Sequence, residues 1–244
     1  MARIALITGA NRGLGFEVAR QLALAGHTAV IGARDPRKGD RAAERLRDEG
    51  LTAEAVTLDV DDIASVRQAA SELGERHGKL DVLVNNAGIL PEATGASAEA
   101  VDAGLFRKTF ETNVLGPVTV IEQLLPLLRA SDAGRIVNVS TRMGSLADQL
   151  DPSSPYHQLP FPAYRSSKTA LNGVTVALSK LLADTPIKVN SICPGSVQTD
   201  LAPGNREQAP LTPEEGSRIV VEMATLPADG PTGAFVDADG LVAW

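Results

Sequence analysis

The sequence has one cysteine, three histidines and no long apolar run, and each of these shortages excludes a class of protein. The lone cysteine, Cys193, cannot form an internal disulfide, so a reducing compartment is the expected environment. The histidines and the cysteine show no ligand spacing, so we expect no metal site. No apolar run approaches the length of a membrane span, and the opening MARIALITGANRG turns polar too soon for a secretory signal.

Positive charge is also scarce. The net charge is -7 at pH 7, whereas nucleic-acid binding needs a basic face, so nucleic acid is not an expected partner. The 244 residues are 43% hydrophobic and 22% charged, which is typical of a soluble protein with enough material for a core. These features predict a cytoplasmic protein that does not bind a membrane.

Short apolar runs alternate with longer amphipathic segments along the whole chain, with no repeat and no change of composition. Apolar strands separated by helices are typical of a parallel sheet covered on both faces. We therefore predict one α/β domain over residues 1–244, a doubly wound parallel sheet of seven strands. The expected strands are 2–8, 28–33, 53–60, 80–86, 134–140, 187–192 and 233–238. The expected helices are 14–25, 38–49, 63–77, 104–129, 162–182 and 213–224.

The segment TGANRGLG joins the first expected strand to the first helix. Its glycines Gly9, Gly13 and Gly15 permit positive φ and a close approach to a ligand. The start of the helix offers unpaired N–H groups and a positive dipole end to a pyrophosphate. A lone glycine pattern is a weak signal, and a turn without a ligand is the alternative. Its position at the first βα junction favours dinucleotide binding.

The end of the second expected strand indicates which dinucleotide binds. An acid there accepts hydrogen bonds from a ribose 2′-hydroxyl, whereas an arginine accommodates a 2′-phosphate. Here Arg34 follows Ala33, and Arg12 lies in the phosphate loop, so two guanidiniums favour NADP(H). Asp35 at the next position weakens this interpretation, and a solvated loop charge is the alternative for Arg34.

The segment AYRSSKTALNGV carries a lysine where an apolar stripe is expected. Helical spacing from Leu171 backwards leads to Lys168 and then to Tyr164 on the same face. Burial of an unpaired ammonium is costly, so Lys168 needs a partner or a role. A pair that reaches solvent is the alternative. The stripe continues forwards through Leu171, Val174, Leu178 and Leu181 or Leu182.

Seven segments in order resemble the short-chain dehydrogenase/reductase family across essentially the whole chain. They are TGANRGLG, LDV at 58–60, NNAG at 85–88, TNVLG at 112–116, NVS at 138–140, YRSSK at 164–168 and PGSVQTD at 194–200. The resemblance implies a one-domain Rossmann-type sheet of seven strands. It also implies nicotinamide-dependent oxidation or reduction of alcohol and carbonyl groups.

The resemblance also implies a role for individual residues. The catalytic four are Asn113, Ser140, Tyr164 and Lys168. The residues expected to bind the cofactor are Gly9, Asn11, Arg12, Gly13, Leu14 and Gly15 at the phosphates, Arg34 at the 2′-phosphate, Asp59 and Val60 at the adenine, Asn86, Ala87 and Gly88 at the ribose, and Pro194, Gly195, Val197 and Thr199 at the nicotinamide.

The four catalytic residues suit carbonyl reduction. A ketone that accepts a hydride develops negative charge on oxygen, and Tyr164 can supply the proton. A lysine one turn away favours phenolate, so we expect Lys168 to lower the pKa of Tyr164, and to donate to the nicotinamide ribose. Ser140 can hydrogen-bond the substrate oxygen. The resemblance implies that Asn113 bends its helix and holds a water.

Within the family, the chain resembles the carbonyl-reductase branch. The gap between Ser140 and Tyr164 is longer than usual, and the ending GPTGAFVDADGLVAW is similar. In family members with a longer gap, the inserted residues cover the helix face through which relatives assemble, and those members are monomers. The insertion here is shorter than in those monomers. Both a monomer and a homo-oligomer therefore stay open. The insertion and its surroundings supply side chains that either line a pocket for apolar or aromatic carbonyl compounds or are only a local cover: Met143, Tyr156, His157 and Phe161.

The expected function is therefore reduction of a ketone or aldehyde by NADPH. The alternatives are an NAD-dependent alcohol dehydrogenase and a protein that senses dinucleotides without turnover; the complete catalytic four argue against the sensor. The segment 201–216, with three prolines and two glycines, is expected either to close over the site as a lid or to be an ordinary loose loop.

Overall fold

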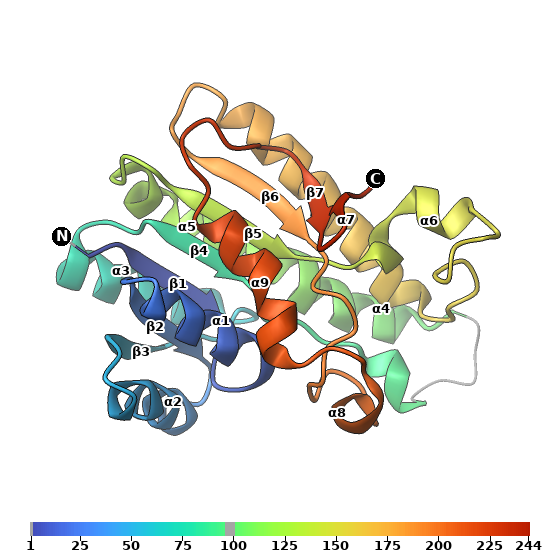
Figure 1. Ribbon diagram of the computed structural model, residues 1–244, viewed down its shortest axis with the longest axis horizontal. Coiled ribbons are helices and arrows are strands. Elements are labelled where there is room, and N and C mark those ends of the chain that lie inside the picture. The colour runs from blue at the N-terminus through green and yellow to red at the C-terminus, as the bar shows by residue number, and fades with distance from the viewer. Residues whose placement is uncertain (1, 96–100) are drawn as a thin grey trace.

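The computed structural model describes residues 2–95 and 101–244, and a single sheet runs through its centre (Figure 1). The strand order is β3-β2-β1-β4-β5-β6-β7-β8, and every neighbouring pair is parallel except β7 and β8. The seven expected strands are confirmed. The strands are β1 (Ile4–Thr8), β2 (Thr28–Ala33), β3 (Ala53–Thr57), β4 (Val82–Asn85), β5 (Arg135–Val139), β6 (Lys188–Ile192), β7 (Phe235–Asp237) and β8 (Gly240–Leu241).

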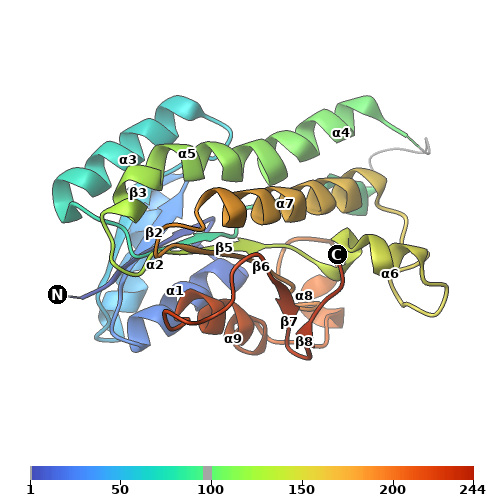
Figure 2. The ribbon, with the colours of Figure 1, turned by 90° about the horizontal axis from the view of Figure 1, so that it is seen from above.

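Helices cover both faces of the sheet. Figure 2 shows α3, α4, α5 and α7 on one face and α1, α2 and α9 on the other. None of the helices in the described ranges is long and apolar enough to cross a membrane. The helices are α1 (Gly13–Leu24), α2 (Pro36–Asp48), α3 (Ile63–His77), α4 (Ala103–Phe110), α5 (Gly116–Arg129), α6 (Leu146–Leu150), α7 (Pro162–Leu181), α8 (Asn205–Gln208) and α9 (Pro213–Ala224).

The core consists of two main apolar layers, one on each face of the sheet. Successive side chains of a strand point to opposite faces, so Ala5 and Ile7 enter one layer while Ile4 and Leu6 enter the other. All five residues of β1 are buried, which explains why its sequence is apolar without alternation. The central strands are thus fixed between two layers of helices, and their carboxyl ends point to one edge.

The structure corrects several expected boundaries. The helix expected over 104–129 is interrupted: a π-helical turn, η2 (Glu111–Leu115), separates α4 from α5, because Asn113 bonds groups outside its helix. The third strand stops at Thr57 rather than at residue 60. An eighth strand of two residues, β8, adds to the expected seven. Two of the long loops contain short helices, α6 and α8.

Candidate active site

The residues expected at the site lie in loops that follow the strands or in the helices α1, η2 and α7. The chain proceeds from β1 outwards through β2 to β3, and then returns to place β4 on the other side of β1. The loops after β1 and β4 therefore diverge at this point, which in an open parallel sheet creates the crevice for a ligand. The loops after β5 and β6 reach the same edge, and α6 and α8 lie there too (Figure 2).

The glycine loop after β1 is packed against the loop after β4. Gly9 has φ +65°, and a Cβ there would lie 3.1 Å from the Cα of Ala87. A Cβ at Gly15 would collide with the Asn86 amide nitrogen, which donates to the Thr8 carbonyl at 2.8 Å. Glycine is required at both positions, and the structure brings the TGANRGLG and NNAG segments together.

The start of α1 fits an anionic ligand. Arg12 precedes the helix in an extended conformation, no side chain caps the helix, and no acid lies in its first turn. Its first-turn amides thus lack a side-chain acceptor, while a pyrophosphate offers several acceptor oxygens and negative charge to the dipole. Gly13, with φ +57°, would place a Cβ 3.4 Å from Thr199, so the loop after β6 borders the same place. Asn11 and Leu14 are half-buried beside it.

The two arginines expected to bind the 2′-phosphate differ in their contacts. Arg12 is exposed and donates to Asp200 at 2.6 Å, and Asp200 also pairs with Arg206 of α8. The Arg206 and Arg12 contacts hold the pKa of Asp200 at about 2. Arg34 is exposed just after β2, and within the described ranges no hydrogen bond or ion pair joins it to another side chain. Asp200 was not among the residues expected at the site. Its negative charge at the end of the PGSVQTD segment is the feature of the sequence that could have indicated a partner for an arginine.

The remaining residues that we expect to bind the cofactor lie after β3 and after β6. Asp59 and Val60 follow β3 in a half-buried loop rather than in a strand, and a Cβ at Gly116 would meet Val60 at 3.1 Å. After β6, Val197 forms a bridge with Leu211, and Gly195 has φ +79°. The group after β6 that borders this site is Pro194, Gly195, Val197 and Thr199.

Lys168 is buried and paired, which explains its place on the stripe. It is 4% exposed, and its ammonium donates to the carbonyl of Val139, at the end of β5, at 2.7 Å. Burial lowers its pKa to about 8. The stripe itself continues through Leu171 and Leu182, whereas Leu181 is 78% exposed.

Asn113 joins the π-helical turn to two other elements. Its amide exchanges two hydrogen bonds with the backbone of Ile89, both at 2.9 Å, and donates to the Ser167 hydroxyl at 3.1 Å. A Cβ at Gly88 would lie 3.3 Å from the side-chain oxygen Oδ1 of Asn113 and 3.6 Å from the Lys168 ammonium. Asn113 and Lys168 therefore face the same small space beside Gly88.

Tyr164 lies one helical turn before Lys168, and the Lys168 nitrogen is 5.8 Å from the centre of its ring. Burial raises the pKa of the Tyr164 phenol, and the nearby Cys193 thiol raises it further. This direction is opposite to the lowering that we expected from Lys168. The physical reason is that both side chains are almost fully buried, so the loss of hydration dominates the ionisation of each.

Ser140, the last of the four residues expected to be catalytic, directly follows β5. Its amide donates to the Ile192 carbonyl at 2.7 Å, which fixes its backbone between β5 and β6. Its hydroxyl is buried, and in the described part of the chain it has no hydrogen-bond partner. A buried hydroxyl without a partner is costly, and a catalytic role is one of the explanations for such a group in a native protein.

The insertion before α7 is anchored by Arg142. This side chain lies in a 3₁₀ turn, η3 (Arg142–Gly144), and binds Asp148 of α6 through two bonds of 2.8 Å. It also approaches Asp237 of β7 at 3.6 Å and lies 5.4 Å from the centre of the Tyr156 ring. The Arg142 pairing lowers the pKa of Asp148. Met143, in the same turn, is half-buried. Periodicity could not reveal this cluster, because its members lie on three elements.

The other expected pocket residues help to shape the insertion. The Nδ1 atom of His157 lies 2.9 Å from the Gln149 carbonyl, so the ring joins two parts of the loop. Phe161 is half-buried directly before α7. At the other end of the chain, Trp244 stacks on Phe235, with 5.5 Å between ring centres. The insertion is therefore a folded cover and not a loose connection.

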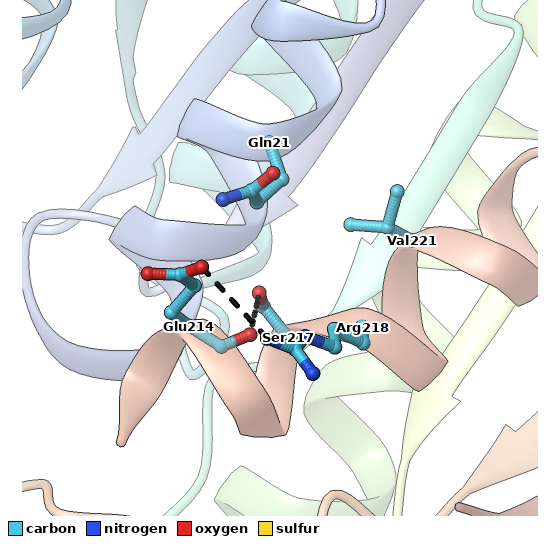
Figure 3. A pocket seen from close by; sticks show the side chains of 5 residues that line it. All are labelled: Gln21, Glu214, Ser217, Arg218 and Val221. Carbon is cyan, nitrogen blue, oxygen red and sulfur yellow. Dashed lines mark hydrogen bonds and ion pairs between the residues drawn. The ribbon is translucent and has the colours of Figure 1, made fainter.

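A surface hollow of about 210 Å³ lies elsewhere, between α1 and α9 (Figure 3). Its lining comprises Gln21, Glu214, Ser217, Arg218 and Val221. None of the residues expected at the site borders it, and its walls include a Glu214–Arg218 pair at 3.9 Å. This hollow is not part of the arrangement described above.

Comparisons with known proteins agree with the geometry. Residues 3–210 match the family model of the short chain dehydrogenases. The (+)-neomenthol dehydrogenase of Arabidopsis thaliana is 35% identical, over 96% of this chain and 95% of its own. The NADPH carbonyl reductase 1 of Sus scrofa is 34% identical, over 99% and 94%. A solved structure of NADPH-bound carbonyl reductase from chicken fatty liver has a TM-score of 0.84 at 29% identity, covering 100% of this chain and 99% of that one. The chain thus belongs to the short-chain dehydrogenase/reductase family of oxidoreductases.

Proposed function

We propose that this protein reduces a ketone or aldehyde with NADPH and that Tyr164 donates the proton. One observation carries the proposal: the buried Ser140 hydroxyl, which has no partner among the described residues, lies next to Val139, whose carbonyl holds the Lys168 ammonium. A buried donor and a buried cation at one strand end suit an oxygen that gains negative charge. The relatives named NADPH carbonyl reductase support the same reaction.

Each residue then has a separate task. When bound, the nicotinamide supplies the hydride. Ser140 donates a hydrogen bond to the carbonyl oxygen and orients it. Tyr164 gives its proton to that oxygen, and the Lys168 ammonium favours the phenolate that remains. Asn113 lies in the π-helical turn, and its side-chain oxygen faces the space beside Gly88 that the Lys168 ammonium also borders.

The cofactor choice is proposed from Arg12 and Arg34. Both side chains are exposed: Arg12 lies in the glycine loop, and Arg34 directly follows β2. A ribose 2′-phosphate is bound at this place in the fold. Arg12 already holds a carboxylate, Asp200, so its geometry suits an anion. The absence of an acid directly after Ala33 disfavours NADH.

A panel of carbonyl compounds tests the function by the loss of NADPH absorbance. The panel includes simple ketones and aldehydes, and neomenthol with NADP for the reverse direction. We expect reduction with NADPH to exceed reduction with NADH on the same substrates. Cofactor binding without turnover on any substrate would support the sensor instead. Faster alcohol oxidation with NAD would support the alternative dehydrogenase.

A further inference from the structure

The N-terminus of α7 has no capping side chain of its own, although this helix carries Tyr164 and Lys168. Phe161 precedes the helix and offers no acceptor from its side chain. Pro162 has no N–H, and the Arg165 amide donates to the Phe161 carbonyl at 2.8 Å. Two first-turn donors therefore need an outside partner: the amides of Ala163 and Tyr164.

Both donors are satisfied by Glu92, far earlier in the chain. Its Oε1 accepts from the Ala163 amide at 2.9 Å, and its Oε2 accepts from the Tyr164 amide at 2.8 Å. Glu92 belongs to a 3₁₀ turn, η1 (Pro91–Thr94), in the loop after β4. A carboxylate that accepts two backbone amides at a helix N-terminus both orders that end and interacts favourably with the dipole.

The same loop is held at its other end by the catalytic asparagine. Ile89, three residues before Glu92, exchanges both of its backbone hydrogen bonds with Asn113. The segment 89–92 therefore links the π-helical turn to the first turn of α7. A displacement of this segment would move Asn113 and Tyr164 relative to each other.

We propose that Glu92 is a positioning residue for Tyr164, acting through the Tyr164 backbone amide and through its negative charge. This rests on the proposed function, in which the neutral phenol donates the proton. The amide contact fixes where the phenol lies relative to Ser140. The negative charge offsets the positive helix end, which would otherwise favour phenolate and remove the proton donor at a lower pH. Among the described residues, the other ionisable groups near Tyr164 are Lys168 on its own helix and Cys193 after β6.

The first test compares kcat with KM. Glu92→Ala removes both acceptors, so we expect kcat for NADPH-dependent reduction to fall about tenfold or more, because small misplacements of reacting groups are costly. The KM for NADPH should change little, since the glycine loop is untouched. Asp102→Ala is the matched control: Asp102 also accepts from two amides, those of Gly104 and Leu105, but it caps α4. We expect the control to keep the wild-type kcat.

The second test separates charge from contact. Glu92→Gln keeps the length and one acceptor oxygen but loses the charge. We expect it to recover most of the kcat lost in Glu92→Ala and to shift the falling limb of the pH profile about half a unit lower. The shift has the same sign whether Tyr164 or Lys168 titrates, because loss of a negative charge lowers both pKa values. Glu92→Asp, which keeps the charge, should leave the limb in place.

Unchanged kcat and pH profile in Glu92→Ala and Glu92→Gln would overturn the inference while the proposed function stands. If the wild type reduces no carbonyl compound, the proposed function fails instead. Hydrogen exchange then tests the contact between Glu92 and α7 without any substrate: the Ala163 and Tyr164 amides should exchange faster in Glu92→Ala but not in Asp102→Ala. Equal exchange in all three proteins would remove the basis of the inference. If Glu92→Ala does not fold, the pH profile of Glu92→Gln tests the inference alone, and an unshifted falling limb overturns it.

Discussion

The Lys168 ammonium lies 5.8 Å from the centre of the Tyr164 ring and donates to the Val139 carbonyl at 2.7 Å. The two side chains share one buried space, where the loss of hydration disfavours the charged form of each. Burial therefore raises the pKa of the phenol and lowers the pKa of the ammonium. We therefore expect the proposed proton donor, Tyr164, to stay neutral over the physiological range, and Lys168 to titrate close to that range.

Replacement of Tyr164 by phenylalanine removes only the hydroxyl that would give the proton. We expect the fold and NADPH binding to be kept and turnover to fall by at least about 10²-fold. Steady-state kinetics measures the loss, while calorimetric NADPH binding and the thermal midpoint serve as controls. Turnover at the wild-type level would rule out Tyr164 as the proton donor.

The rate of reduction should fall as the pH rises through about 8, because Lys168 then loses its positive charge. The ordinary pKa of lysine is 10.5, so the unfolded chain keeps this proton to higher pH than the folded chain. Between these two values the unfolded state binds more protons, and the Lys168 contribution to the free energy of unfolding rises with pH. Activity and this stability contribution should thus change in opposite directions above pH 8.

Lys168→Arg tests this assignment, because a guanidinium keeps its charge throughout. In that variant the falling limb of the pH profile should move to higher pH or disappear, even if the maximal rate is lower. Lys168→Ala should lose both turnover and cofactor affinity. A limb that stays at the same pH in Lys168→Arg would assign it to another group.

Arg34→Ala should weaken NADPH binding far more than NADH binding, since only NADPH carries the 2′-phosphate. Charge-assisted contacts of this kind contribute about 1.5–3 kcal/mol each, so the selectivity for NADPH should fall at least about tenfold. Titration calorimetry with both cofactors measures the ratio. Equal weakening of both would transfer the role to Arg12, which is held by Asp200 at 2.6 Å.

The segment 201–216 provides a prediction about dynamics. It contains α8 and is tied back by the pair of Val197 with Leu211 and by the Arg206–Asp200 contact. If it acts as a lid, hydrogen exchange across 202–211 should slow when NADPH binds. Asp200→Asn, which frees both arginines, should reduce that protection. The same exchange with and without NADPH would identify an ordinary surface loop.

The sequence alone determined the layers of this fold. Apolar runs alternating with amphipathic segments predicted the seven parallel strands and most helices, because burial on both faces leaves its own pattern in each element. The glycine loop, the lysine on the stripe and the strand-end motifs were also local signals. The burial of Lys168 followed from its position on the stripe, since the helical period assigned it to the buried face.

The tertiary structure decided what depends on distant partners. The π-helical turn at Asn113 is stabilised by Ile89 and Ser167, which no local period connects to it. Arg12 meets Asp200 only because the loops after β1 and β6 reach the same edge of the sheet. The raised pKa of Tyr164 reflects how completely the fold excludes water around it. Periodicity records which face of an element is buried, whereas the strand order determines which side chains of different elements meet there.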